Sequence, residues 1–97
     1  NDPTMIFLAI HTHLPENCII DNPEEIKKFR AALSEEEAIK NGCRLISVYV
    51  SPTEHVAYII FETKEHENML SFLKPLIKLG ITEVKPVDEW KKVSNYL

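Results

Sequence analysis

Cysteine and glycine are scarce in this sequence, with two of each among 97 residues. The N-terminus also lacks the apolar stretch of a secretory leader, so both thiols are expected to stay free in a reducing cytoplasm. The scarcity of glycine argues against phosphate-binding loops and dinucleotide fingerprints, which need closely spaced glycines. Neither a disulfide scaffold nor a dinucleotide-binding domain is therefore expected.

An excess of basic charge and a long hydrophobic run are missing as well. Eleven Lys and Arg residues stand against fifteen Asp and Glu residues, which gives a net charge of −4. Phosphate contacts need clustered basic side chains, so no nucleic-acid partner is expected. A membrane-spanning helix needs about 20 consecutive apolar residues, and no run approaches that length, so no membrane partner is expected.

The length of the chain fits a single domain. Met5 is expected to mark the natural start, with residues 1–4 left over from cloning and residues 5–97 forming that domain. Hydrophobic residues make up 44% of the chain and charged residues 27%, an ordinary globular composition. The core of so short a chain is small, and a homodimer would let it bury more apolar surface.

Hydrophobic periodicity predicts alternating strands and helices. Asn22 and Pro23 are typical of a helix start, because Asn caps a helix and Pro suits the first helical position. Pro75 is expected to kink or interrupt the second helix. Gly42 and Gly80 each follow a helix, where a left-handed cap is expected. The predicted strands cover residues 5–10, 44–50, 55–61 and 81–87, and the predicted helices cover residues 23–40 and 64–79.

The order β-α-β-β-α-β predicts an α+β, ferredoxin-like fold. Its four-stranded antiparallel sheet would carry the helices on one face and leave the other uncovered. An uncovered apolar sheet face is typical of an interface, so we expect a homodimer through that face. The residues expected there include Phe7, Ala9, Leu45 and Tyr49, whereas Ile6, Leu8 and Ile10 are better suited to the helix-covered face.

Two strand-like runs carry a resemblance to a known group of proteins. Residues 45–52 read LISVYVSP and residues 56–62 read VAYIIFE. Together they resemble the dimeric α+β barrel superfamily, and the pattern is most similar to small, uncharacterised prokaryotic stand-alone domains within it. The resemblance implies the ferredoxin-like fold and a homodimer. Some relatives of this shape bind nickel or other metals, and others are haem or cofactor-free oxygenases.

Several side chains able to bind a metal ion are predicted to meet at one edge of the sheet. His11 and His13 lie two residues apart at the end of the first strand, so both should leave the same strand face. In the expected topology this strand end shares an edge with the turn between the second and third strands. Imidazole and thiolate ligands suit Zn, Ni, Cu or Fe better than Mg or Ca. The predicted ligands are His11, His13, Cys18 and His55, with Glu16 and Glu54 as nearby oxygen ligands or supporting partners.

The strand pattern also bears on where the two histidines point. If Ile6, Leu8 and Ile10 face the helices, both histidines face the open, dimer-forming side of the sheet. Tyr49 and Tyr58, on neighbouring strands, could then line a pocket on that side. Aromatic packing between adjacent strands explains the same pair without a pocket.

Other interpretations of the histidines and of Cys18 stay open. The motif H-x-H arises often by chance, and Cys18 could be a small buried hydrophobe or a nucleophile activated by a histidine. The first hypothesis is a small cytosolic dimeric domain that binds a transition metal. The second is a small-molecule enzyme of the dimeric α+β barrel type with His11 or His13 as general base, and the third is a non-catalytic ligand-sensing or interaction module. Whether the domain is an enzyme is left open.

Overall fold

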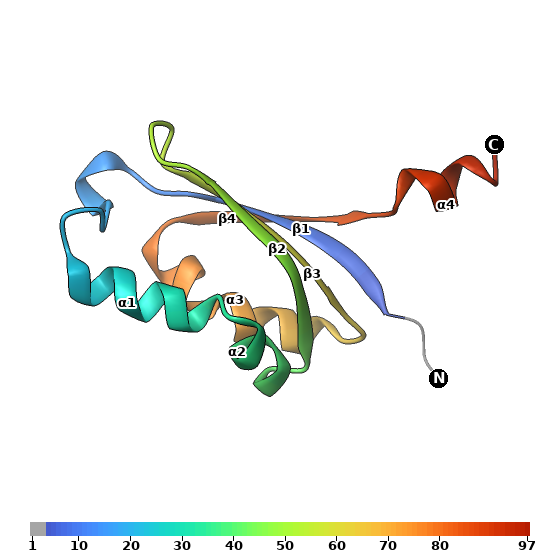
Figure 1. Cartoon of the computed structure of the whole chain (residues 1–97), viewed down its shortest axis with the longest axis horizontal. Coiled ribbons are helices and arrows are strands. Elements are labelled where there is room, and N and C mark those ends of the chain that lie inside the picture. The colour runs from blue at the N-terminus through green and yellow to red at the C-terminus, as the bar shows by residue number, and fades with distance from the viewer. Residues whose placement is uncertain (1–3) are drawn as a thin grey trace.

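The computed structural model describes residues 4–97 and consists of one four-stranded sheet with helices packed mainly on one side (Figure 1). The strands are β1 (Met5–Thr12), β2 (Cys43–Ser51), β3 (Val56–Thr63) and β4 (Ile81–Val87). The helices are the short 3-10 turn η1 (Pro15–Asn17), α1 (Pro23–Ala32), α2 (Glu35–Lys40), α3 (His66–Leu79) and α4 (Trp90–Ser94). Apart from Thr4, the expectation about residues 1–4 lies outside the described residues.

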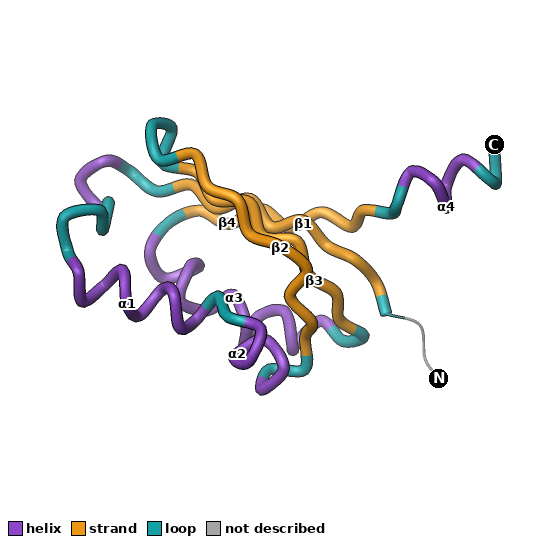
Figure 2. Tube along the Cα trace, in the orientation of Figure 1, coloured by secondary structure: helices purple, strands orange, loops and turns teal. Residues whose placement is uncertain are grey.

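The strand order is β2-β3-β1-β4, and every neighbouring pair is antiparallel. The element order β-α-α-β-β-α-β-α is roughly ferredoxin-like, which confirms the predicted α+β fold class. In Figure 2, α1, α2 and α3 lie together on one side of the strands, whereas α4 stands apart at the end of β4. None of the described helices is both long and apolar enough to cross a membrane.

The helix boundaries agree with the sequence at the start of α1 and differ further along. Asn22 caps α1, because its side-chain oxygen accepts a hydrogen bond from the backbone N–H of Glu25 at 3.2 Å. The predicted first helix is divided in two, since Ser34 begins α2 by accepting from the N–H of Glu37 at 3.1 Å. The interruption expected at Pro75 is wrong, because α3 continues through it. Gly42 has the expected left-handed φ of 75°, but Gly80 is extended.

The two faces of β1 are the reverse of the expectation. Phe7 and Ala9 pack in the core beneath the helices, so Ile6, Leu8 and Ile10 lie on the open face. The reason is aromatic packing, since the Phe7 ring stacks on Phe61 at 5.8 Å between centroids. Phe61 in turn meets Phe72 of α3 edge-on at 5.5 Å. These aromatic contacts fix the odd-numbered side of β1 toward the helices.

The placement of Leu45 on the open face is also wrong, and a β-bulge explains it. The register of β2 against β3 shifts between Leu45 and Ser47, so an extra residue, Ile46, interrupts the alternation. Leu45 pairs with Phe61 and Val48 with Ile59, and both pack against the core. A strict period of two predicts opposite faces for Leu45 and Val48, and the bulge brings them to the same face.

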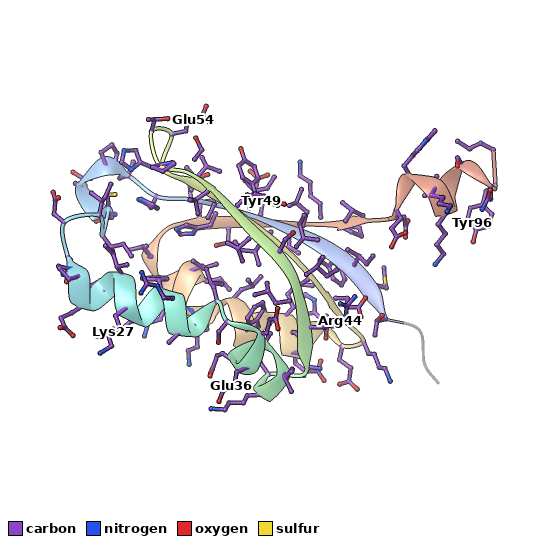
Figure 3. The ribbon with its side chains drawn as sticks, in the orientation of Figure 1. Lys27, Glu36, Arg44, Tyr49, Glu54 and Tyr96 are labelled. Carbon is purple, nitrogen blue, oxygen red and sulfur yellow. The ribbon has the colours of Figure 1, made fainter. Side chains whose placement is uncertain are left out.

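The open face of the sheet carries apolar side chains on β1 and β3 and charged ones on β4, where Lys85 lies opposite Leu8 and Glu83 opposite Ile10. Tyr49 is 66% exposed and lies on the side of the sheet away from Lys27 and Glu36 of the helices (Figure 3). In the register of the sheet it sits opposite Tyr58, which sits opposite Ile10. Tyr49 is therefore the one residue correctly assigned to this face by the sequence pattern.

Candidate metal centre

The end of β1 and the β2–β3 hairpin meet at one edge of the molecule, as Figure 1 shows. The N–H of His13 donates to the carbonyl oxygen of His55 at 3.3 Å, which joins the two segments directly. His55 has a φ of 57° in the hairpin turn, a left-handed conformation that His adopts more readily than most non-glycine residues. A Cβ at Gly80 would collide with the Thr12 carbonyl oxygen, so glycine there lets the start of β4 lie against the end of β1.

The structure brings His13, Cys18 and His55 into one cluster, with one potential ligand atom of each within 4.8 Å of the others. Cys18 reaches the cluster because its N–H donates to the Pro15 carbonyl oxygen at 3.1 Å and closes the η1 turn. In a tetrahedral zinc site, bond lengths of about 2.0–2.3 Å place the ligand atoms roughly 3.5 Å apart. Contractions of roughly 1 Å would therefore convert this cluster into a coordination site.

His11 is not part of this cluster, although it contacts His13. It is only 2% exposed, and its Nε2 lies 3.2 Å from Nδ1 of His13. The His13 ring also meets the His55 ring edge-on, with 5.3 Å between centroids. Metal-bound histidines ordinarily hold their second ring nitrogen in a hydrogen bond of this kind. The contact with His11 therefore occupies Nδ1 of His13 and leaves its Nε2 free of hydrogen bonds among the described residues.

Three ring nitrogens at this edge are buried without a hydrogen-bond partner among the described residues: Nδ1 of His11, Nε2 of His13 and Nδ1 of His55. Each such buried polar atom costs about 1–3 kcal/mol of stability. A metal ion bound to His13 and His55 would satisfy two of the three. The residues present thus fit a metal ion by geometry and by their unmet bonding capacity.

Burial also favours the protonation state that a metal needs. Burial lowers the pKa of His11, and the adjacent His13 lowers it further. The pKa of His13 is lowered for the same reason, first by burial and then by His55. Both rings are consequently neutral near pH 7, which is the form that ligates metals. When Nδ1 of His13 carries the proton and donates to Nε2 of His11, the lone pair of Nε2 remains for an ion.

The three clustered residues form one wall of a pocket of about 310 Å³. The other lining residues are mainly apolar, and they come from the loop before α1, from α1 and from both strands of the hairpin. They include Ile19 and Ile20 of the loop before α1, Ile26 of α1, and Val50 and Ala57 of the hairpin strands. The consecutive isoleucines in a segment expected to be a loop were the sequence signal for this wall, and the prediction did not use it.

The remaining predicted site residues lie away from the cluster. Glu16 is exposed in η1, and Glu54 lies at the hairpin tip, where it accepts a hydrogen bond from the Ser51 hydroxyl at 3.0 Å (Figure 3). Tyr49 and Tyr58 are on the opposite face of the sheet. The expectation that His11 and His13 point toward the open face is wrong. His11 follows Phe7 and Ala9 on the helix-covered side, and His13 contacts His11 and lines the pocket with Ile26 of α1.

Residues 5–97 match the model of a protein family with the description Domain of unknown function (DUF3303). The chain belongs to this family. The match spans nearly the whole chain, but its description assigns no activity. No curated protein and no solved structure matches the chain. What this DUF3303 domain does must therefore be argued from its own residues.

Proposed function

We propose that this DUF3303 domain binds a transition-metal ion through His13, Cys18 and His55. The observation that carries the proposal is the convergence of three ligand atoms within 4.8 Å, two of them supplied by imidazoles with an unpartnered buried nitrogen. In this proposal His11 is a positioning residue, because its contact with Nδ1 of His13 directs Nε2 toward the ion. Three protein ligands leave a fourth coordination position open, as in catalytic or ligand-binding zinc sites.

The ligand set selects the class of metal. Two imidazoles and a thiolate suit Zn, Ni, Cu or Fe, whereas Mg and Ca prefer oxygen ligands. Glu16 and Glu54 are exposed and do not join the cluster, which leaves it without a nearby carboxylate from those positions. A bound Cys18 must be reduced, so the site suits a reducing compartment such as the cytoplasm.

The test is elemental analysis of untagged protein purified without chelator, followed by titration with Co²⁺. We expect close to one ion per chain, and a thiolate-to-cobalt absorption band that Cys18→Ser removes. His13→Ala should also lose the ion, whereas His66→Ala, an exposed histidine in the first turn of α3, should keep it. A folded wild-type protein that binds none of Zn, Ni, Cu or Fe after incubation with each of them would overturn the proposal.

We also propose that the domain forms a homodimer through the open face of its sheet, as in dimeric α+β barrels. Ile10, Tyr58 and Tyr49 lie side by side across three strands on this face, with Leu8 beside Ile60 along them. The helix α4 extends beyond the sheet and exposes 72% of Trp90 and 78% of Tyr96, and a second copy would cover such side chains (Figure 2).

Light scattering tests the dimer directly. Wild-type protein should have twice the chain mass of 11.2 kDa at micromolar concentration. Leu8→Arg on the open face should give a monomer, and Leu70→Arg, at an exposed position on α3, should not. A wild-type protein that is monomeric under these conditions would overturn the dimer.

A second candidate function is a small-molecule enzyme with His11 or His13 as general base. The observation in its favour is that burial lowers the pKa of both imidazoles, which favours the neutral form that a base needs, and that His13 lines an apolar pocket. This candidate predicts a folded protein that takes up no metal. The third hypothesis, a non-catalytic sensing or interaction module, predicts that substituting the histidines leaves oligomeric state and partner binding unchanged.

A further inference from the structure

The pocket beside the metal cluster has two chemically distinct parts. His13, Cys18 and His55 supply the polar wall, and among the other lining residues only Ser51 carries a polar side chain. Its volume of about 310 Å³ is at the lower end of the roughly 300–1,000 Å³ range of small-molecule sites. Such a pocket fits a small apolar body with one polar group directed at the cluster.

We propose that this pocket binds a short aliphatic carboxylate, with its head group in the open coordination position of the metal and its chain against Ile19, Ile20 and Ile26. This inference rests on the proposed function, because the metal supplies the anchor. The isoleucines come from the loop before α1 and from α1 itself, so the chain of the ligand would fill the space between that segment and the β2–β3 hairpin.

The net charge of the metal with its three protein ligands determines which head group the pocket prefers. A divalent ion with one thiolate and two neutral imidazoles carries a net charge of +1. Burying an uncompensated charge beside apolar walls is costly, and a monoanionic ligand removes it. A carboxylate therefore matches the site, whereas an alkylamine would add to the positive charge and an alcohol would leave it unchanged.

The apolar lining residues determine how affinity depends on the length of the aliphatic chain. Burying each methylene contributes about 0.8 kcal/mol, which corresponds to roughly a fourfold gain in affinity. The gain should continue along a series of carboxylates until the pocket is full, and then stop. A ligand bound only through its head group would show no such dependence on chain length.

The experiment titrates Co²⁺-loaded protein with acetate, butyrate, hexanoate and octanoate and follows the visible cobalt bands. We expect affinity to rise about fourfold per methylene over the shorter members and to level off at the longer ones. Hexanol and hexylamine, which lack the anionic head group, should leave the cobalt spectrum unchanged. Ile26→Gln should flatten the chain-length dependence, and Leu70→Gln on the exposed side of α3 should preserve it.

The outcomes separate the two proposals. If cobalt binds but affinity does not depend on chain length, the carboxylate pocket is overturned and the metal site stands. The carboxylate pocket is also overturned, and the metal site also stands, if the Ile26→Gln variant binds cobalt and its carboxylate affinity still rises with chain length as in the wild type. If folded protein takes up no cobalt, zinc, nickel, copper or iron, the metal site fails and the carboxylate inference fails with it.

Discussion

Cys43, Thr63 and Asn68 lie together at one end of the sheet, and a second group of polar side chains lies at the other end around Cys18. In the first group the Thr63 hydroxyl donates to the Gly42 carbonyl oxygen at 3.2 Å and contacts the N–H of Glu65 at 3.4 Å. The Asn68 side chain donates to the same Gly42 carbonyl oxygen at 3.4 Å, and its backbone carbonyl oxygen lies 3.6 Å from the Cys43 sulfur. This group satisfies its polar atoms within the chain.

In the group around Cys18, several polar atoms have no hydrogen-bond partner among the described residues. The contact between His11 and His13 is its one side-chain hydrogen bond among the described residues, and three ring nitrogens stay buried without a partner. Burial raises the pKa of the Cys43 thiol, which keeps that sulfur protonated and unsuited to a metal. The comparison teaches that polar atoms bonded within the chain serve folding, whereas several unbonded ring nitrogens gathered beside a thiol are what supports the proposed metal site.

The largest expected effect contrasts the two cysteines. Cys18→Ser should weaken metal binding by more than the ~10–100-fold loss that an outer-shell partner causes, because it removes a ligand. Cys43→Ser should retain the metal and lower the free energy of unfolding, because it places a more polar hydroxyl in the core. Cobalt titration and urea unfolding measure the two effects. If Cys18→Ser retained the metal and Cys43→Ser lost it, the distinction between the two ends of the sheet would be wrong.

The next effect concerns His11, which we expect to act through His13. His11→Leu removes the acceptor for Nδ1 of His13 and should weaken metal binding by about 10–100-fold. His11→Gln offers an amide oxygen in place of the ring nitrogen and should recover part of that loss. Competition with a chelator measures the metal affinity of both variants. Equal affinities in the Leu and Gln variants would show that the hydrogen bond to His13 does not orient it.

A smaller effect compares two buried hydroxyls. Thr63→Val leaves its hydrogen-bonding neighbours unpaired and should lower the free energy of unfolding by about 1–3 kcal/mol. Thr82→Val removes a buried hydroxyl oxygen with no partner among the described residues, so it should be neutral or slightly stabilising. Urea unfolding of metal-free protein measures both. If the two variants lose equal stability, satisfaction of hydrogen bonds does not distinguish these positions.

The fold class could be predicted because its determinants are local. The periodic strands, the Asn22 cap and the order of elements each follow from neighbouring residues. The faces of the strands could not be predicted in the same way. They depend on the stacking of Phe7 on Phe61 and on the bulge beside Leu45, and both are interactions between strands far apart in the sequence.

The candidate site shows the same division. The arrival of His13 and His55 at one edge follows from the topology, which the order of elements predicts. The position of His11 outside the cluster does not follow from the topology, because it depends on which face of β1 packs against the core. The apolar pocket depends on how the loop carrying Ile19 folds back against the hairpin, and no local pattern specifies that.

The smallest effect tests an ion pair at the end of the sheet where polar groups are satisfied. Nε of Arg44 donates to a Glu62 carboxylate oxygen at 2.7 Å, and this hydrogen bond holds the pKa of Glu62 below its ordinary value. The unfolded chain therefore binds more protons between the two pKa values, so stability falls as the pH falls through this window. The contribution is complete above the ordinary Glu pKa of about 4.3 and lost below the folded pKa. Because the Arg44 side chain is 64% exposed, high salt should shrink the effect. Urea unfolding from pH 6 to pH 2 should show the wild-type advantage over Glu62→Gln vanishing as the pH falls, and Arg44→Gln should lose the same advantage above pH 5. An advantage that is independent of pH in both variants would show that this pair is not among the satisfied polar groups on which the comparison of the two ends depends.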